Sequence, residues 1–239
     1  MRQKLLRMES EYQHDGLRAI LLLPETAPRR LLTLLHGAGE GPETVLENFD
    51  LASIVDGRGL AVLLPTLGNS FCLDWGAGMD TRAALLCELL PAAQAECGIP
   101  AVPGENVVGG ISMGGYAAIS LALEEPERFC AAFSLSGALS LKKSAQLLRI
   151  CGLRAPTGLG ERADARTLLE KSAAKPPLYL DWGDGDWFLE ENRAFARRAA
   201  ARGIPVRAVE RPGLHNWALW RQSLGPAVEW AAETARTPK

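Results

Sequence analysis

A serine between two glycines is the residue of this chain whose surroundings favour chemistry most strongly. Ser112 stands in G-I-S-M-G, residues 110–114, which matches the G-x-S-x-G spacing of a nucleophile elbow. A serine hydroxyl attacks an acyl carbon only when a tight turn exposes it, a base takes its proton and N–H groups stabilise the oxyanion. The motif is also compatible with an ordinary glycine-rich turn. Catalysis therefore depends on whether the chain supplies the partners.

The base must be one of three histidines, and His215 has the most favourable position. It follows the last predicted strand, in the loop before a C-terminal helix, which agrees with the order serine, acid, histidine. His36 opens a glycine-rich segment directly after another predicted strand, and we expect this segment to form an oxyanion loop. His14 precedes the first clear strand and is expected at the surface.

Three aspartates, Asp181, Asp184 and Asp186, lie at or just after the end of a predicted strand. Asp181 is within the strand, and Asp184 is in a glycine-flanked turn, where aspartate is favoured by local backbone hydrogen bonds alone. Asp186 follows the turn and can reach the loop of His215. We therefore predict a Ser112, Asp186 and His215 triad, in which the carboxylate orients the imidazole and stabilises its protonated form.

The oxyanion hole requires two N–H groups close to the developing charge. Met113 directly follows the nucleophile and should supply one, while Gly37 or Ala38 should supply the other. The aromatic side chains of Trp187 and Trp217 lie next to the predicted acid and base in the sequence and are candidates for the substrate pocket. Packing of the loops onto the sheet is the alternative interpretation of such tryptophans.

Apolar segments alternate with helix-like segments along the chain, which predicts an α/β fold. Strands are predicted at residues 17–23, 31–35, 60–64, 106–110, 131–135, 178–182 and 206–210. Several are continuously apolar, as expected for a mostly parallel central sheet with helices on both faces. Helices are predicted at 80–97, with a kink at Pro91, at 116–123 and at 190–202.

We expect residues 1–239 to form a single domain, because no repeat or linker divides them. Residues 140–177 are longer than a strand-helix-strand connection needs and predict a helical insertion. It either forms a cap near the substrate or is an elaborated crossover that does not touch it.

Composition limits the class of partner. The net charge of −2, without a long basic run, gives no indication of nucleic-acid binding. No apolar stretch is long enough for a transmembrane span, and residues 1–9 lack the apolar core of a signal peptide. Five scattered cysteines favour a reducing cytoplasm, with Cys87 and Cys130 expected in the core. We predict no metal and no cofactor. A homo-oligomer is left open.

Segments 36–39, 110–116, 134–139, 183–188 and 213–217 together resemble the putative-esterase family of α/β-hydrolases. This group includes tributyrin esterases, esterase D with S-formylglutathione hydrolase, and feruloyl-type esterases, and the order and spacing are most similar to the small tributyrin esterases. The resemblance implies an α/β-hydrolase fold, the triad named above and oxyanion donors at Ala38 and Met113.

Two segments differ from the family. The chain before residue 31 is shorter than usual, which suggests that an edge strand is missing. Residues 69–76 occupy the place of an aromatic loop beside the active site but differ in sequence. From this segment we predict substrate contacts by Trp75 and by Cys72, although a solvent-facing thiol is the alternative for Cys72.

The sequence thus predicts a serine carboxylesterase that hydrolyses short-chain acyl esters through an acyl-enzyme on Ser112. Its expected partner is a small-molecule ester substrate. A thioesterase of the S-formylglutathione-hydrolase type would use the same triad. A binding module that has the fold without the activity is a third interpretation.

Overall fold

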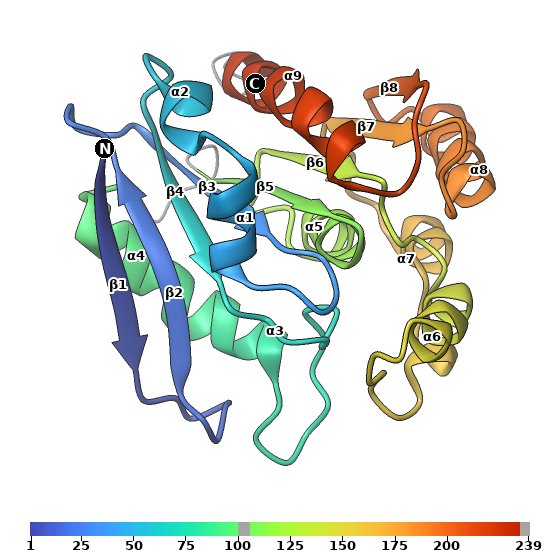
Figure 1. The fold of residues 1–239 in the computed structure, drawn as a ribbon, viewed down its shortest axis with the longest axis horizontal. Coiled ribbons are helices and arrows are strands. Elements are labelled where there is room, and N and C mark those ends of the chain that lie inside the picture. Colours follow the sequence, from blue (N-terminus) through green and yellow to red (C-terminus); the bar gives the residue numbers. More distant parts are fainter. Residues whose placement is uncertain (100–105, 235–239) are drawn as a thin grey trace.

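The computed structural model describes residues 1–99 and 106–234, and within them eight strands form one sheet. The strand order is β1-β2-β4-β3-β5-β6-β7-β8, with β1 and β2 antiparallel to their neighbours and the remaining pairs parallel. Parallel strands bring their carboxyl ends to the same edge of the sheet, where α/β proteins bind ligands. Loops from distant parts of the sequence therefore meet at one place (Figure 1).

The elements agree closely with the sequence pattern. The strands are β1 (Arg2–Met8), β2 (Leu17–Leu23), β3 (Arg30–Leu35), β4 (Leu60–Pro65), β5 (Asn106–Ile111), β6 (Ala131–Leu135), β7 (Leu178–Gly183) and β8 (Val206–Arg211). The helices are α1 (Pro42–Asn48), α2 (Leu51–Val55), α3 (Thr81–Ala84), η1 (Leu85–Leu89), α4 (Leu90–Cys97), α5 (Met113–Glu124), α6 (Leu141–Ile150), η2 (Leu159–Glu161), α7 (Ala165–Lys171), α8 (Leu189–Ala201) and α9 (Trp217–Thr234). All seven predicted strands are present, with ends that differ by at most one residue.

Two apolar layers cover the sheet. One joins the sheet to α1, α2 and α9, and the other joins it to α4, α5, α6, α7 and α8. Figure 1 shows the same division, with α5 directly against the centre of the sheet. Because every residue of β4, β5, β6 and β7 is buried, these strands have no solvent-exposed face, which explains their mostly apolar sequences. The prediction of a sheet covered on both faces is confirmed.

Several sequence-based expectations are wrong. The chain has an edge strand before residue 31, because β1 pairs along its whole length with β2. Its sequence, RQKLLRM, is mostly exposed and carries three positive charges, as suits an edge strand that must not pair with another chain. Cys87 is exposed and Cys130 is only partly buried, so neither is a core residue. His14 is exposed, as expected.

The helix predicted at residues 80–97 is interrupted by a π-helical turn. This turn, η1, lies between α3 and α4 and ends just before Pro91. Proline has no N–H to continue the ladder of helical hydrogen bonds, so a disturbance one turn earlier is expected. The predicted kink therefore takes the form of a widened turn.

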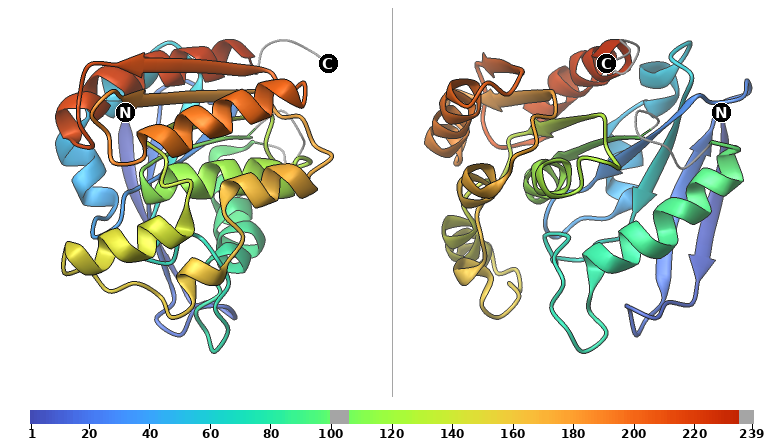
Figure 2. Two further views of the ribbon diagram at one scale, coloured as in Figure 1. Left: turned by 90° about the vertical axis from the view of Figure 1, so that its right-hand side faces the viewer. Right: turned by 180° about the vertical axis from the view of Figure 1, so that it is seen from behind.

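Residues 140–177 carry α6, η2 and α7, so the segment is helical as predicted. Figure 2 shows these elements along one side of the molecule, next to α5 and α8. The segment is fastened from both sides: the Tyr116 hydroxyl on α5 donates to the carbonyl of Ala163 at 2.8 Å, and Lys143 forms an ion pair with Glu191 on α8 at 3.0 Å. No helix among the described residues is both long and apolar enough to cross a bilayer.

Candidate active site

Ser112 lies at the sharp turn between β5 and α5. Its backbone has φ 53° and ψ −109°, a conformation that costs a non-glycine residue free energy and persists only where the surroundings enforce it. A Cβ on Gly110 would lie 2.2 Å from the carbonyl oxygen of Gly114, and a Cβ on Gly114 would lie 2.2 Å from that of Leu35. Glycine is required at both positions because backbone, not side chains, fills the space.

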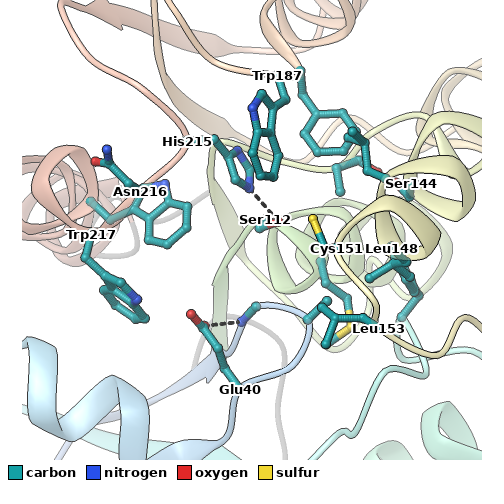
Figure 3. A pocket seen from close by; sticks show the side chains of 18 residues that line it. Glu40, Ser112, Ser144, Leu148, Cys151, Leu153, Trp187, His215, Asn216 and Trp217 are labelled. Carbon is teal, nitrogen blue, oxygen red and sulfur yellow. Dashed lines mark hydrogen bonds between the residues drawn. The ribbon is translucent and has the colours of Figure 1, made fainter.

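The predicted triad residues form one continuous hydrogen-bond chain. His215 Nε2 lies 2.9 Å from Ser112 Oγ, and His215 Nδ1 lies 3.0 and 3.1 Å from the two carboxylate oxygens of Asp186. The side chain of His215 is 7% exposed and that of Asp186 is 0% exposed. Three loops that are far apart in the sequence therefore bring together a hydroxyl, an imidazole and a carboxylate in the arrangement needed for nucleophilic catalysis. Figure 3 shows the hydrogen bond between His215 and Ser112 at the cavity.

The other two aspartates have structural partners. Asp181 is buried in β7 and binds the Arg211 guanidinium at 2.8 Å and the Ser223 hydroxyl at 2.7 Å. Asp184 accepts a hydrogen bond from the N–H of Gly213 at 3.0 Å and so connects the acid loop to the histidine loop. Of the three candidates, the structure brings only Asp186 to His215.

The pKa of Asp186 lies below its usual range. Burial by itself would raise this pKa, because it disfavours the charged carboxylate. The hydrogen bond and the charge of His215, together with the N–H of Phe188 at 2.7 Å, outweigh that effect. The acid is therefore ionised at neutral pH and can stabilise a protonated His215.

The glycine-rich loop after β3 is held by His36. Its Nδ1 donates to the carbonyl of Gly37 at 2.7 Å, and its Nε2 accepts from the N–H of Leu67 at 3.0 Å. Burial lowers the pKa of His36, which keeps the ring neutral as this pattern of one donor and one acceptor requires. His36 therefore fixes the shape of the loop beside the active site.

The N–H groups around Ser112 differ in their partners. The N–H of Gly37 donates to the carboxylate of Glu40 at 3.2 Å. Within the described residues, the N–H groups of Ala38 and Met113 have no hydrogen-bond acceptor, and both residues line the cavity beside Ser112. Met113 is also the first residue of α5, where the helix dipole favours negative charge. Ala38 and Met113 are therefore better placed than Gly37 to receive an oxyanion.

A cavity of about 320 Å³ opens at Ser112. On one side its wall is apolar and comes largely from α6 and the loop after it, with Leu147, Leu148 and Leu153. On the other side lie Trp217 and Glu40 (Figure 3). The insertion at residues 140–177 thus contributes a wall of the cavity, which favours the first of the two interpretations of this segment.

Three aromatic rings surround His215. Trp187 stacks on the imidazole with centroids 5.0 Å apart and planes at 15°, Trp220 meets it edge-on at 5.1 Å, and Phe188 lies at 5.5 Å. These rings exclude water from the base and leave its edges free for Ser112 and Asp186. Trp187 and Trp217 both line the cavity, as the sequence suggested.

The expected substrate contacts of Cys72 and Trp75 are wrong, because neither residue lines this cavity. Cys72 is fully buried, so it is not a solvent-facing thiol either, and burial raises its pKa to about 12. Trp75 packs under the Arg162 guanidinium at 4.7 Å and donates to the carbonyl of Ser70 at 3.0 Å. Phe71, their neighbour, is the residue of this loop that reaches the cavity.

Sequence reasoning missed Glu40, Trp220 and the leucines of α6. Glu40 could have been noticed as an acid inside the glycine-rich segment 36–41. The others carry no local pattern that separates a cavity residue from a core residue. Among the described residues, no group of three or more His, Cys, Asp or Glu side chains could hold a metal ion.

Comparison with protein families decides the classification. The model of the family described as "Putative esterase" matches residues 79–231, which include Ser112, Asp186 and His215. The chain belongs to this family. It is a serine ester hydrolase with the α/β-hydrolase fold, as the sequence predicted.

Similar proteins agree with this assignment. An acetyl esterase of Caldicellulosiruptor saccharolyticus is 26% identical to this esterase over 86% of the chain and 84% of its own length. The fluorophosphonate-binding serine hydrolase F of Staphylococcus aureus has a TM-score of 0.82 at 23% identity, covering 97% of this chain and 98% of its own. The S-formylglutathione hydrolase of the same organism has a TM-score of 0.82 at 22% identity, covering 97% and 100%. The two structures show the shared fold.

Proposed function

We propose that this esterase hydrolyses short-chain acyl esters through a covalent acyl-enzyme on Ser112. The hydrogen-bond chain from Asp186 through His215 to Ser112 carries the proposal. It supplies a nucleophile, a base within reach of its proton, and an acid that orients the base.

Acylation begins when His215 Nε2 takes the proton of Ser112 and the serine oxygen attacks the ester carbonyl carbon. The carbonyl oxygen becomes an oxyanion, which the N–H groups of Ala38 and Met113 stabilise. Collapse of this intermediate breaks the bond to the alcohol oxygen, which takes the proton from His215. The alcohol leaves, and the acyl group stays bonded to Ser112.

Deacylation repeats these steps with water. His215 takes a proton from the water molecule as its oxygen attacks the acyl carbon, and the same two N–H groups stabilise the second oxyanion. The bond to Ser112 then breaks, and the serine oxygen recovers its proton from His215. Asp186 stays ionised throughout and stabilises the imidazolium that forms in each half of the reaction.

The size and lining of the cavity support a short acyl group. At about 320 Å³ it lies at the lower end of the range for small-molecule sites, about 300–1,000 Å³. Its walls from α6 are apolar, so they suit an alkyl chain rather than a charged acyl group. The activity named for the curated relative, an acetyl esterase, is consistent with this size.

Thioester hydrolysis is the second candidate, because the same triad can attack a thioester and a structural neighbour is named as an S-formylglutathione hydrolase. Of the described residues that line the cavity, none is Lys or Arg. A cavity without a cationic side chain is poorly suited to a leaving group that carries carboxylates, as glutathione does. We therefore place ester hydrolysis first.

We infer that residues 140–177 act as a small cap within a single domain. The leucines of α6 that line the cavity support this role. The five free cysteines support a reducing cytoplasm as the compartment.

The test compares the wild-type enzyme with Ser112→Ala on p-nitrophenyl acetate and butyrate. We expect kcat to fall by about 10⁴-fold or more, because removal of a triad member leaves only the oxyanion hole and binding. A fluorophosphonate probe should modify the wild-type protein at Ser112 and leave the variant unmodified. Equal turnover by the two proteins would contradict the proposal, and a folded wild-type protein without an adduct would favour a binding module.

A further inference from the structure

Glu40 is a half-buried carboxylate in the cavity that neither the triad nor the oxyanion hole uses. The position that a Cβ on Gly37 would take lies 2.8 Å from Glu40 Oε2 and 3.8 Å from Ser112 Cβ, so the carboxylate faces the nucleophile across one glycine. Figure 3 shows its side chain rising from the loop toward the space below Ser112 and Trp217. A negative charge is thus held within reach of any bound ester.

This charge has no cationic partner among the described residues. Within the part of the chain that the structure describes, Glu40 forms no ion pair, and no Lys or Arg side chain lines the cavity. Burial raises the pKa of Glu40, while the N–H of Gly37, the Trp217 indole and the nearby His215 counteract part of this rise. A carboxylate that has lost part of its hydration without gaining a counter-ion gives the cavity a negative potential.

Glu40 lies on the side of the cavity that we assign to the alcohol. His215 protonates the departing oxygen, so the rest of the alcohol extends over the residues that surround His215 and follow it. Trp217 is two residues further along and lines the cavity together with Glu40, and a hydrogen bond from its indole counteracts part of the rise in the pKa of Glu40. The cap side, with Leu148 and Leu153, lies across the cavity from them (Figure 3).

We propose that Glu40 and Trp217 form a subsite for a cationic group on the alcohol portion of the ester. The inference rests on the proposed function and adds the chemical class of the substrate. Carboxylates and indole rings both attract alkylammonium groups, the first by its charge and the second by its ring quadrupole. A cation bound there restores the neutralisation that Glu40 lacks in the free enzyme. An anionic alcohol is repelled by the same charge.

A purely structural role for Glu40 leads to a different expectation. Its carboxylate accepts the N–H of Gly37, and this bond by itself would fix the oxyanion loop for every ester equally. Glu40→Gln keeps the shape of the side chain and one oxygen acceptor for the N–H of Gly37, while it removes the charge and replaces the second oxygen by an NH2 group. The variant therefore separates selection by charge from support of the loop.

The experiment measures kcat/KM for three acetate esters that differ in the charge of the alcohol. Acetylcholine carries a quaternary ammonium group, 3,3-dimethylbutyl acetate is its neutral counterpart of the same shape, and 3-sulfopropyl acetate carries an anion. All three release acetate by the same hydrolysis. The ratio of cationic to neutral kcat/KM therefore reports the charge preference and is independent of any change common to all three esters.

For the wild-type enzyme we expect kcat/KM to be about tenfold higher for the cationic ester than for the neutral ester. We expect kcat/KM for the anionic ester to be lower than that of the neutral ester by a similar factor. Glu40→Gln should bring both ratios close to one. The matched control is Glu47→Gln, which removes an exposed carboxylate on α1 outside the cavity and should leave both ratios at their wild-type values.

Three outcomes are distinguishable. Cationic-to-neutral ratios that are near one in the wild type, or unchanged in Glu40→Gln, overturn the subsite. A uniform loss of activity in Glu40→Gln with unchanged ratios shows a positioning role and also overturns it. Failure of the wild-type enzyme to hydrolyse p-nitrophenyl acetate or any of the three esters contradicts the proposed function itself.

Discussion

The catalytic wall and the cap wall of the cavity are built in different ways. The catalytic wall consists of loops at the carboxyl ends of β3, β5, β7 and β8, and hydrogen bonds or backbone contacts fix each functional group. The cap wall consists of α6 and the loop that follows it, where Leu147, Leu148 and Leu153 contribute only apolar surface. The function of the catalytic wall depends on atomic positions within a few tenths of an ångström. The function of the cap wall depends mainly on the volume of its side chains.

This difference indicates where the enzyme tolerates change. Apolar side chains on a helix can be exchanged for others with a modest loss of packing. A carbonyl oxygen 2.2 Å from a hypothetical Cβ cannot move aside without displacing a strand. We expect the chemistry to be sensitive to one added methyl group, while the acyl preference responds gradually to the size of the cap side chains.

The largest effect is expected from Gly114→Ala. The new Cβ would meet the backbone oxygens of Leu35 and His36 at 2.2 and 2.8 Å, so the elbow cannot close. We expect the free energy of unfolding to fall by about 4 kcal/mol or more, or the protein not to fold. Urea unfolding followed by circular dichroism measures the change.

Gly225→Ala is the matched control for this substitution. Gly225 lies within α9, and a Cβ there meets no atom within 4 Å. Alanine stabilises a helix by about 0.5–1 kcal/mol relative to glycine, so this variant should be as stable as the wild type or slightly more stable. Equal stability of the two variants would show that the elbow is not closely packed.

An intermediate effect is expected from Leu147→Ala on the cap wall. Removal of three carbon atoms widens the cavity, so kcat/KM for p-nitrophenyl acetate should fall by less than about tenfold while the preference shifts toward longer acyl chains. A series of esters from acetyl to octanoyl measures the shift. Ile150→Ala, at a residue of the same helix that is 79% exposed, should leave the series unchanged. A shift in Ile150→Ala, or none in Leu147→Ala, would contradict this account of the cap.

The smallest effect concerns stability and the charge of Glu40. Its pKa is raised in the folded state, so its contribution to stability is full at low pH and is lost as the pH rises through the folded pKa. Glu40→Gln should therefore be more stable than the wild type at pH 7, by less than about 1 kcal/mol because the carboxylate is partly solvated.

Thermal unfolding at two pH values measures this difference. A change of this size corresponds to at most about 4 °C in Tm for a domain of this length, and it should disappear near pH 4. A variant that is less stable than the wild type at pH 7 would indicate that the carboxylate stabilises the loop more than its burial costs.

The strands of the catalytic wall were predictable because they are buried on both faces. A mostly apolar run such as residues 131–135 has few other structures available, and β6 begins and ends at these residues. Strand β1 was missed for the opposite reason. It lies at the edge with charged residues on both faces, so its sequence shows neither an apolar run nor alternation.

The hydrogen-bonding part of the site was more predictable than the cavity walls, of which only Trp187 and Trp217 were expected from the sequence. The order of triad residues along the chain requires Ser112 and His215 to follow particular strands, so few residues were candidates. Asp186 was chosen because it follows a turn and can reach the loop that carries His215. Cys72 shows the limit: a loop position in the sequence gave no indication that Phe71 and Cys72, both with positive φ, fold the loop inward and bury the thiol. Burial depends on contacts between distant segments, which local patterns do not record.

The sequence by itself determined the type of chemistry, because an elbow needs glycine, serine and helix at fixed short spacings and leaves few alternatives for its partners. Only the tertiary structure decided which side chains face the substrate. The cap leucines and Glu40 reach the cavity from segments about a hundred residues apart. The side chain of Asn69 connects these segments, because it accepts a hydrogen bond from the N–H of Gly39 at 2.7 Å and donates one to the carbonyl of Arg154 at 3.1 Å. Such contacts arise from packing across the whole sheet, so no local spacing can encode them.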